Sequence, residues 1–322
     1  MRCWLIVLVL LPGPALAEWY RDARDMMGTR VSVELWADSA EQGNAAINDA
    51  MAAMAEVNRL MNPWDEASEL SAVNRSAASK PVPLSAWVYD VVHSALEYSR
   101  LSGGAFDISF ASAGQYYDYR AGVAPNASQL AAAIPSIDYR SLLLDSEKRS
   151  LAFRRDGVRV DLGGIAKGFA VDRAIDAVQS HGVESAVISA GGDSRILGNL
   201  GDRPRTIGIR HPRKAGEFAV MIPLEDTAIS TSGDYERFFI ADDGRRVHHI
   251  LDPATGKSAG FVQSASILAP LAVDSDALST TVFVLGVDAG LAMVNRLPEI
   301  EAIVIDDAGR LHFSAGLLRE SP

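Results

Sequence analysis

The sequence predicts an α+β fold of two interpacked lobes, built on mainly antiparallel or mixed sheets and sharing one cleft. Strand-like segments follow one another through tight turns such as Asp242-Asp243-Gly244. Helices are inserted among these strands with only occasional strand–helix alternation, whereas a doubly wound parallel sheet requires that alternation throughout. Hydrophobic residues make up 48% of the chain, which is ample for a sizeable core.

The N-terminus has the features of a secretory signal. An apolar run from Trp4 to Leu11, too short to span a bilayer, is followed by Ala15-Leu16-Ala17 as a cleavage site. Cys3 precedes the run instead of closing it, which argues against a lipid anchor on this cysteine. We therefore expect residues 1–17 to be removed, and residues 18–322 to form one functional unit in the periplasm without an integral membrane span.

Composition narrows the chemistry of the mature chain. No cysteine remains after cleavage, which excludes disulfides, thiolate catalysis and a cysteine-bound metal. The formal charge of −11 becomes −12 when Arg2 leaves with the signal. This charge argues against nonspecific binding to nucleic acid or anionic lipid, so no nucleic-acid partner is expected. A polyanionic substrate would need a local cluster of Lys, Arg or metal.

The first elements are predicted from periodicity. Residues 30–36 alternate as a strand, and Ser39 with Gln42 resembles a capping box at the start of a long amphipathic helix. Pro63 ends this helix and places Trp64 on a loop, where it either covers the core or stacks on a planar ring. The buried stripe of the helix is read as core and consists of Ile47, Ala50, Met51, Met54, Val57 and Met61.

A second helix is predicted from about Ser85 to Leu101, ending at Gly103-Gly104. The next segment, residues 105–109, reads as an apolar strand start interrupted by Asp107, and a buried carboxylate needs partners. Residues 111–150 contain a short helix from 128 to 133, and no chemistry is assigned to them.

Two Gly-Gly turns follow strand-like segments. The stretch 160–172 reads as a short strand, a break at Gly163-Gly164, and a helix with Lys167 in its first turn. Glycines let the backbone approach a ligand, and free N–H groups at a helix start favour an anion such as phosphate. An ordinary strand-to-helix turn explains this stretch alone equally well. The second turn, Gly191-Gly192, comes after a strand at 185–189 and is followed directly by Asp193.

The C-terminal half adds strands, two histidines and a last helix. His248 and His249 are adjacent on a strand and must point to opposite faces. Asp276 and Thr280 share one face of a helix that Asp274 or Ser275 caps, unless they are merely a helix-start carboxylate and a hydroxyl bonded to its own helix. That helix ends near Gly286, and a short helix follows at 291–297. The strands are predicted at 206–210, 218–224, 227–231, 236–240, 264–268, 302–305 and 311–314.

Together these features favour transfer of a phosphorus centre. Gly-rich turns, a lysine, oxygen ligands for a hard cation and a histidine that titrates near neutrality are the groups that this chemistry needs. The turns do not spell a dinucleotide-binding or P-loop motif, and no G-x-S-x-G elbow supports a serine hydrolase.

Seven motifs, in order, resemble the FAD:protein FMN transferase (ApbE) family and cover most of the mature chain. They are Met27-Gly28-Thr29, Gly104-Ala105-Phe106-Asp107, the stretch 160–172, Ala190-Gly191-Gly192-Asp193, Thr231-Ser232-Gly233-Asp234-Tyr235, the stretch 249–256 (HILDPATG) and Asp276-Ala277-Leu278-Ser279-Thr280. Ser194 and Thr206 depart from the residues common at their positions, which affects only local packing.

The resemblance implies a flavin cleft between the lobes and an enzyme that binds FAD. With Mg²⁺, such an enzyme cleaves the FAD pyrophosphate, attaches FMN to a threonine of a partner protein and releases AMP. The partner implied is a redox subunit with an Asp-Gly-x-Ser/Thr-Gly-Ala-Thr type motif. Two alternatives remain: a periplasmic FAD pyrophosphatase that yields FMN and AMP, and a non-catalytic flavin-binding protein.

The resemblance also assigns residues. His249 would be the base for the incoming hydroxyl. The metal would be held by Asp276, Thr280 and a main-chain oxygen of Gly164. The positions matching flavin contacts are Met27, Trp64, Ala105, Phe106, Asp107, Asp161, Lys167 and Ile250.

Overall fold

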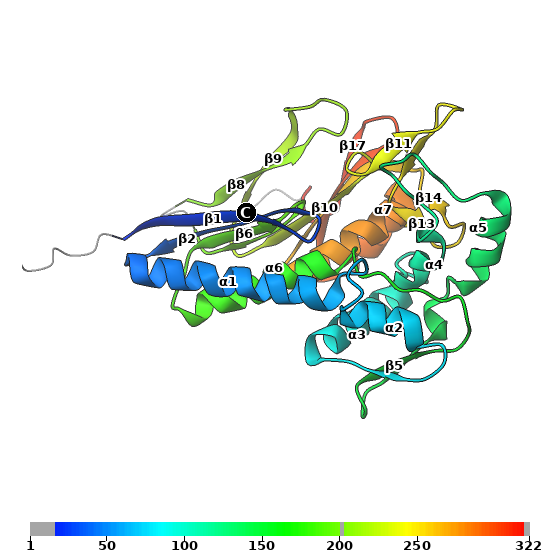
Figure 1. Ribbon diagram of the computed structural model, residues 1–322. Helices are drawn as coiled ribbons and strands as arrows, with labels where there is room; N and C mark the ends of the chain where they lie inside the picture. The colour runs from blue at the N-terminus through cyan, green and yellow to red at the C-terminus, as the bar shows by residue number, and fades with distance from the viewer. Residues whose placement is uncertain (1–16, 200–202, 319–322) are drawn as a thin grey trace, which may run out of the picture.

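The computed structural model describes residues 17–199 and 203–318, so nearly all of the predicted signal lies outside the described residues. Its central feature is an eight-stranded antiparallel sheet with the order β1-β2-β6-β7-β10-β15-β16-β17 (Figure 1). The predicted α+β class is confirmed. The strands are β1 (Glu18–Met26), β2 (Thr29–Ala37), β6 (Ala186–Ala190), β7 (Asp193–Leu197), β10 (Ala228–Gly233), β15 (Val262–Ala269), β16 (Glu301–Asp306) and β17 (Leu311–Phe313).

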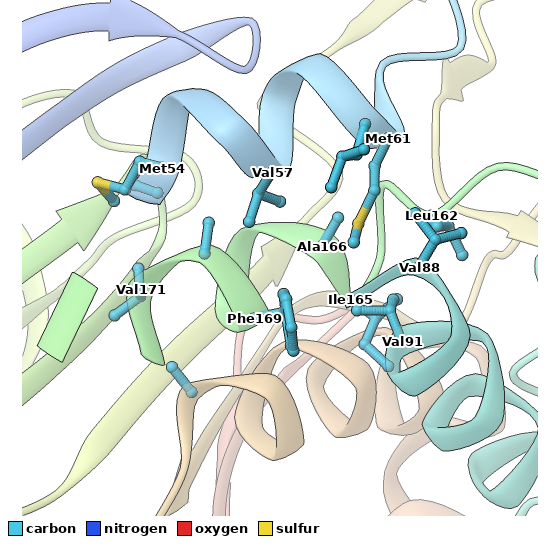
Figure 2. Close-up of a cluster of buried hydrophobic side chains, with 14 of the residues drawn as sticks. Met54, Val57, Met61, Val88, Val91, Leu162, Ile165, Ala166, Phe169 and Val171 are labelled. Carbon is cyan, nitrogen blue, oxygen red and sulfur yellow. The ribbon is translucent and has the colours of Figure 1, made fainter. Parts of the chain in front are cut away.

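Three helices, α1 (Ala40–Met61), α6 (Ala166–Ser180) and α7 (Ala272–Val294), cover one face of this sheet (Figure 1). α1 begins as predicted, because the hydroxyl of Ser39 accepts the N–H of Gln42 at 3.2 Å. The methionine stripe of α1 is core, with Met51 and Met54 fully buried. Figure 2 shows this stripe lying over the start of α6.

The helix α7 is, in the described part of the chain, the one helix long and apolar enough to cross a membrane. It is packed inside the protein instead, against α6, β10 and β15. The sequence predicts that this helix ends near Gly286; the residue does interrupt the helical geometry, with φ 78° and ψ −176°, but the helix continues beyond it to Val294. α7 is therefore a core helix with a kink.

A smaller, mainly helical lobe lies beside the end of the sheet layer (Figure 1). One continuous hydrophobic cluster joins the two, because Val57 of α1 and Ile165 belong to the same cluster as Val88 and Val91 of α3 (Figure 2). The lobes are thus interpacked, as predicted. The smaller lobe contains α2 (Glu69–Ser76), α3 (Ala86–Leu101), α4 (Ala111–Gly114), α5 (Ala127–Ala133) and a sheet of β3 (Val82–Pro83), β5 (Ser150–Phe153) and β4 (Leu142–Asp145).

Three small hairpins complete the described fold, and the turn at residues 242–244 joins two of their strands as predicted. The hairpins are β8 (Arg205–Arg210) with β9 (Phe218–Leu224), β11 (Phe238–Ile240) with β12 (Arg246–His248), and β13 (Leu251–Asp252) with β14 (Lys257–Ser258).

Two predicted strands are wrong. Residues 105–109 are not a strand, because Asp107 caps a 3₁₀ helix, η1 (Ile108–Phe110), and accepts the N–H groups of Ser109 and Tyr139, each at 2.8 Å. The segment before Gly163 is also not a strand. Its Val160 bonds through both main-chain groups to the side-chain amide of Asn74, at 2.8 and 2.9 Å. In both places a polar side chain replaces the partner strand.

Candidate active site

The geometric centre of the site is a lysine held between two buried carboxylates. Nζ of Lys167 lies 2.6 Å from Oδ2 of Asp193 and 3.2 Å from Oδ1 of Asp276. Both aspartates are 2% exposed. Burial, together with the neighbouring Asp193, raises the pKa of Asp276 to about 7. Although burial alone would lower the pKa of Lys167, the two carboxylates hold it above its usual range. The ammonium of Lys167 is therefore charged, and the two carboxylates already balance its charge.

The first turn of α6 contacts the first turns of α7 closely enough to build this cluster. The carboxylate of Asp276 accepts the main-chain N–H of Gly168 at 2.9 Å. The prediction that Asp274 or Ser275 caps the start of α7 is wrong, because the cap comes from α6. The carboxylate of Asp172 accepts the N–H groups of Ala272 and Val273 at 3.0 and 2.8 Å. It also forms an ion pair with Arg195 at 2.7 Å.

The predicted metal residues lie together at this junction. A Cβ added to Gly164 would lie 3.3 Å from Oγ1 of Thr280, so the two residues are in contact. The hydroxyl of Thr280 bonds to Ser232 at 3.2 Å and not to a carbonyl of its own helix. No three His, Cys, Asp or Glu side chains in residues 17–199 and 203–318 form a metal-binding group. A cation here would therefore depend partly on hydroxyl and main-chain oxygens, which suit Mg²⁺.

The expectation that free N–H groups at the start of α6 bind the anion needs correction. Four of these groups are already bonded within the protein. The N–H of Gly163 donates to Asp161 at 2.6 Å, and that of Gly168 donates to Asp276. The N–H groups of Ile165 and Ala166 both donate to the carbonyl of Leu162. An anion at this helix start must rely mainly on side chains.

The prediction that both histidines lie on one strand is wrong, because His248 is the last residue of β12 and His249 follows the strand; their side chains nevertheless have different surroundings. His248 is buried, bonds through Nε2 to the carbonyl of Ala259 at 2.7 Å and meets the ring of Phe283 edge-on. His249 instead turns its ring toward Tyr119, with the ring centroids 6.5 Å apart. Burial, followed by the nearby Arg237, lowers the pKa of His249 to about 3. His249 is neutral at physiological pH and belongs to the candidate site, whereas His248 belongs to the core.

The candidate flavin residues divide between this junction and the periphery. Phe106 lies beside Gly164, and Ala105 packs against the hydrophobic cluster that contains Ile250. Asp107 has its carboxylate bonded within the smaller lobe. Burial raises the pKa of the Asp161 carboxyl, and the positive charges of Arg237 and Lys167 partly oppose this rise.

Met27 and Trp64 lie at the periphery. Met27 has φ 55° in the turn between β1 and β2, and Trp64 is 85% exposed on the loop after α1. A hollow of about 560 Å³ between α5 and residues 254–257 shares none of the predicted site residues. This hollow is therefore separate from the predicted flavin residues.

Sequence reasoning missed three polar residues around the cluster. Asp193 follows the second Gly-Gly turn, so its position after a buried strand was a usable signal. Asp172 lies on the buried face of α6, where a carboxylate requires a partner. Arg237, whose carbonyl accepts the N–H of His249 at 3.1 Å, gave no sequence signal of its own.

Comparison with known proteins identifies the family of this chain. The model of the ApbE family matches residues 27–304. The FAD:protein FMN transferase of Treponema pallidum is 32% identical over 95% of this chain and 90% of that protein. The Vibrio cholerae protein of the same name is 30% identical over 98% of both chains. The crystal structure of an ApbE protein from Thermotoga maritima superposes with a TM-score of 0.85 at 30% identity, covering 94% of this chain and all of that one. The chain therefore belongs to the ApbE family.

Proposed function

We propose that this protein is an FAD:protein FMN transferase that acts with Mg²⁺, attaches FMN through a phosphoester to a threonine of a partner protein and releases AMP. Family membership and the names of the relatives support the transferase activity. The observation that supports phosphorus chemistry at this site is the position of Lys167 between Asp193 and Asp276. Asp276 in turn lies one helix turn before Thr280 on α7.

Asp276, Thr280 and the main-chain oxygen of Gly164 would hold the Mg²⁺ ion. Their carboxylate, hydroxyl and carbonyl oxygens are the donors that this hard cation prefers. The two buried carboxylates around a single lysine leave negative charge that a divalent cation would balance. When bound, Mg²⁺ supplies polarisation of the phosphoryl group and neutralisation of charge on the leaving group.

His249 would accept the proton of the attacking threonine hydroxyl. The hydroxyl oxygen bonds to the phosphorus of the FMN half, the bond from that phosphorus to the bridging oxygen breaks, and AMP leaves with the bridging oxygen. Phosphate binding beside Arg237 would raise the low pKa of His249 during this step, because one of the charges that lowers it is then compensated.

The test is release of AMP from FAD with and without an acceptor peptide carrying the Asp-Gly-x-Ser/Thr-Gly-Ala-Thr motif of a redox subunit. A transferase releases AMP mainly with the peptide, and the peptide gains the mass of FMN. Equal AMP release without peptide would instead indicate an FAD pyrophosphatase. Flavin binding without AMP release would indicate a binding protein.

We also propose a periplasmic location, with the mature chain starting at Glu18. β1 begins at Glu18, which is consistent with cleavage directly before the folded domain. N-terminal sequencing of the protein from a periplasmic fraction tests this proposal. A cytoplasmic product that keeps Met1 and Arg2 would contradict it.

A further inference from the structure

The phosphates of FAD need a positive partner that the residues assigned so far do not supply. This reasoning rests on the proposed function. Lys167 is shared by two carboxylates, so it brings no net positive charge to a ligand. Most of the N–H groups at the start of α6 are bonded internally. Each phosphate of FAD carries a negative charge, and burying such charges requires ion pairs or charge-assisted hydrogen bonds.

Arg237 is placed to supply this charge. It precedes β11 directly, and its carbonyl accepts the N–H of His249 at 3.1 Å, so its backbone lies beside the candidate base. Its side chain reaches the turn between β1 and β2, where Nη2 lies 3.4 Å from the carbonyl oxygen of Gly28. A Cβ at Gly28 would lie 3.1 Å from the same nitrogen, so the turn leaves room for the guanidinium.

No carboxylate of the described residues lies within 4.0 Å of the Arg237 guanidinium, whereas neighbouring arginines are paired. Arg213 forms two bonds to Asp234, at 2.7 and 2.6 Å, and Arg245 pairs with Asp243. The charge of Arg237 instead acts on two site residues. It contributes to the low pKa of His249 and opposes the rise in the pKa of Asp161 that burial causes, and Lys167 acts on both groups in the same sense. The contact that places Arg237 beside the site is the hydrogen bond from the N–H of His249 to its carbonyl.

We infer that Arg237 is a phosphate-binding residue, whose guanidinium donates hydrogen bonds to the phosphate oxygens of bound FAD. A planar guanidinium with several donors suits two oxygens of one phosphate better than an ammonium does. The single hydrogen bond to the Gly28 carbonyl leaves most of these donors available.

The experiment compares the Kd of FAD, FMN and riboflavin for wild-type protein, Arg237→Ala, Arg237→Lys and Arg245→Ala, measured by flavin fluorescence in Mg²⁺. Riboflavin has the same ring system without phosphate. Losing charge-assisted hydrogen bonds to a phosphate should weaken FAD and FMN binding about 10-fold or more in Arg237→Ala, with riboflavin unchanged. Arg237→Lys should recover part of the loss. Arg245→Ala, which removes an exposed and paired arginine of the next turn, should match wild type.

Two results would overturn the inference while leaving the proposed function standing. In the first, Arg237→Ala binds FAD as wild type does. In the second, it loses riboflavin as much as FAD, which would place Arg237 on the ring system or in the fold. A melting curve of each variant shows whether the fold is kept. Wild-type protein that binds none of the three flavins would instead refute the proposed function, and the inference with it.

Discussion

The carboxylate of Asp276 accepts the main-chain N–H of Gly168 across 2.9 Å, and this hydrogen bond joins α7 to the first turn of α6. The two helices approach so closely that a Cβ on residue 168 would lie 2.1 Å from the carbonyl oxygen of Ala272. The distance between Lys167 and Asp276 is a consequence of this contact. The close packing of α6 against α7 therefore also forms the candidate site.

Gly168→Ala should destabilise the protein because a methyl group has no room against the backbone of Ala272. We expect the free energy of unfolding to fall by about 2 kcal/mol or more in urea denaturation, despite the better helix propensity of alanine. Gly260→Ala is the control, since nothing lies within 4 Å of a Cβ there. Equal stability of both variants would mean that α6 and α7 are less closely packed than described.

Asp172→Ala should also be destabilising, because Asp172 supplies the cap of α7 from another helix. Its removal leaves the buried N–H groups of Ala272 and Val273 without an acceptor and Arg195 without its anion. Loss of a cap and of a buried ion pair predicts about 2–4 kcal/mol. Asp176→Ala on the exposed face of the same helix is the matched control and should change stability by less than about 0.5 kcal/mol. A cost for Asp172→Ala as small as this control would remove the capping role.

His249 should make the protein less stable in acid. Its folded-state pKa of about 3 lies below the ordinary 6.5. As the pH falls from 6.5 toward 3, the unfolded chain takes up a proton that the folded chain does not, so stability is lost over this window. His249→Gln should lose about 2 kcal/mol less than wild type between pH 7 and pH 5. Parallel stability curves for both proteins would show that His249 titrates normally when folded.

The two histidine variants should separate chemistry from folding. We expect His249→Ala to slow FMN transfer while FAD affinity is largely kept, because the role proposed for the ring is to accept a proton and not to anchor the flavin. His248→Ala should instead lower the melting temperature, since His248 is buried on Ala259 and Phe283, with little change in transfer per folded molecule. Transfer at the wild-type rate in His249→Ala would assign the base to another group or to water.

Trp64→Ala should change flavin affinity more than stability. The side chain is 85% exposed, so its loss should alter the free energy of unfolding by less than about 0.5 kcal/mol. Stacking on the flavin ring would make the same variant bind riboflavin several-fold more weakly, by about 0.5–1.5 kcal/mol. Trp36→Ala serves as a control on the β2 surface, where Trp36 meets Trp19 edge-on. Unchanged riboflavin binding in Trp64→Ala would exclude the stacking role.

The sequence predicted those elements whose side-chain periodicity is strong. The stripe from Ile47 to Met61 and the long apolar strand near Ile267 were recognisable because burial alone determines such patterns. β1 was missed, since its residues are mostly polar and its identity comes from pairing with β2. The cap of α7 by Asp172 is separated from that helix by 100 residues, and no local pattern encodes such a contact.

The candidate site shows the same division. The motifs around Lys167 and Asp276 could be quoted from the sequence, and their ion pair shows why two distant motifs belong to one site. Asp193 and Arg237 were not assigned, because their positions depend on how β7 and β11 place them beside other elements. Long-range placement was therefore the missing information, and not residue type.

The most direct test of the account is a Mg²⁺ titration of FAD turnover in Asp276→Asn, with a melting curve of the same sample. Asparagine keeps an acceptor for the N–H of Gly168 but lacks the charge for a metal. We predict a folded protein whose turnover is reduced by about 100-fold or more at Mg²⁺ concentrations that saturate the wild type. The reduction should be the same with water or with peptide as acceptor. Asp274→Asn, two residues earlier on α7 and bonded to Tyr98, should keep normal Mg²⁺ dependence. Normal turnover of Asp276→Asn at ordinary Mg²⁺, with only a lowered melting temperature, would make Asp276 a purely structural link between α6 and α7 and contradict the metal site.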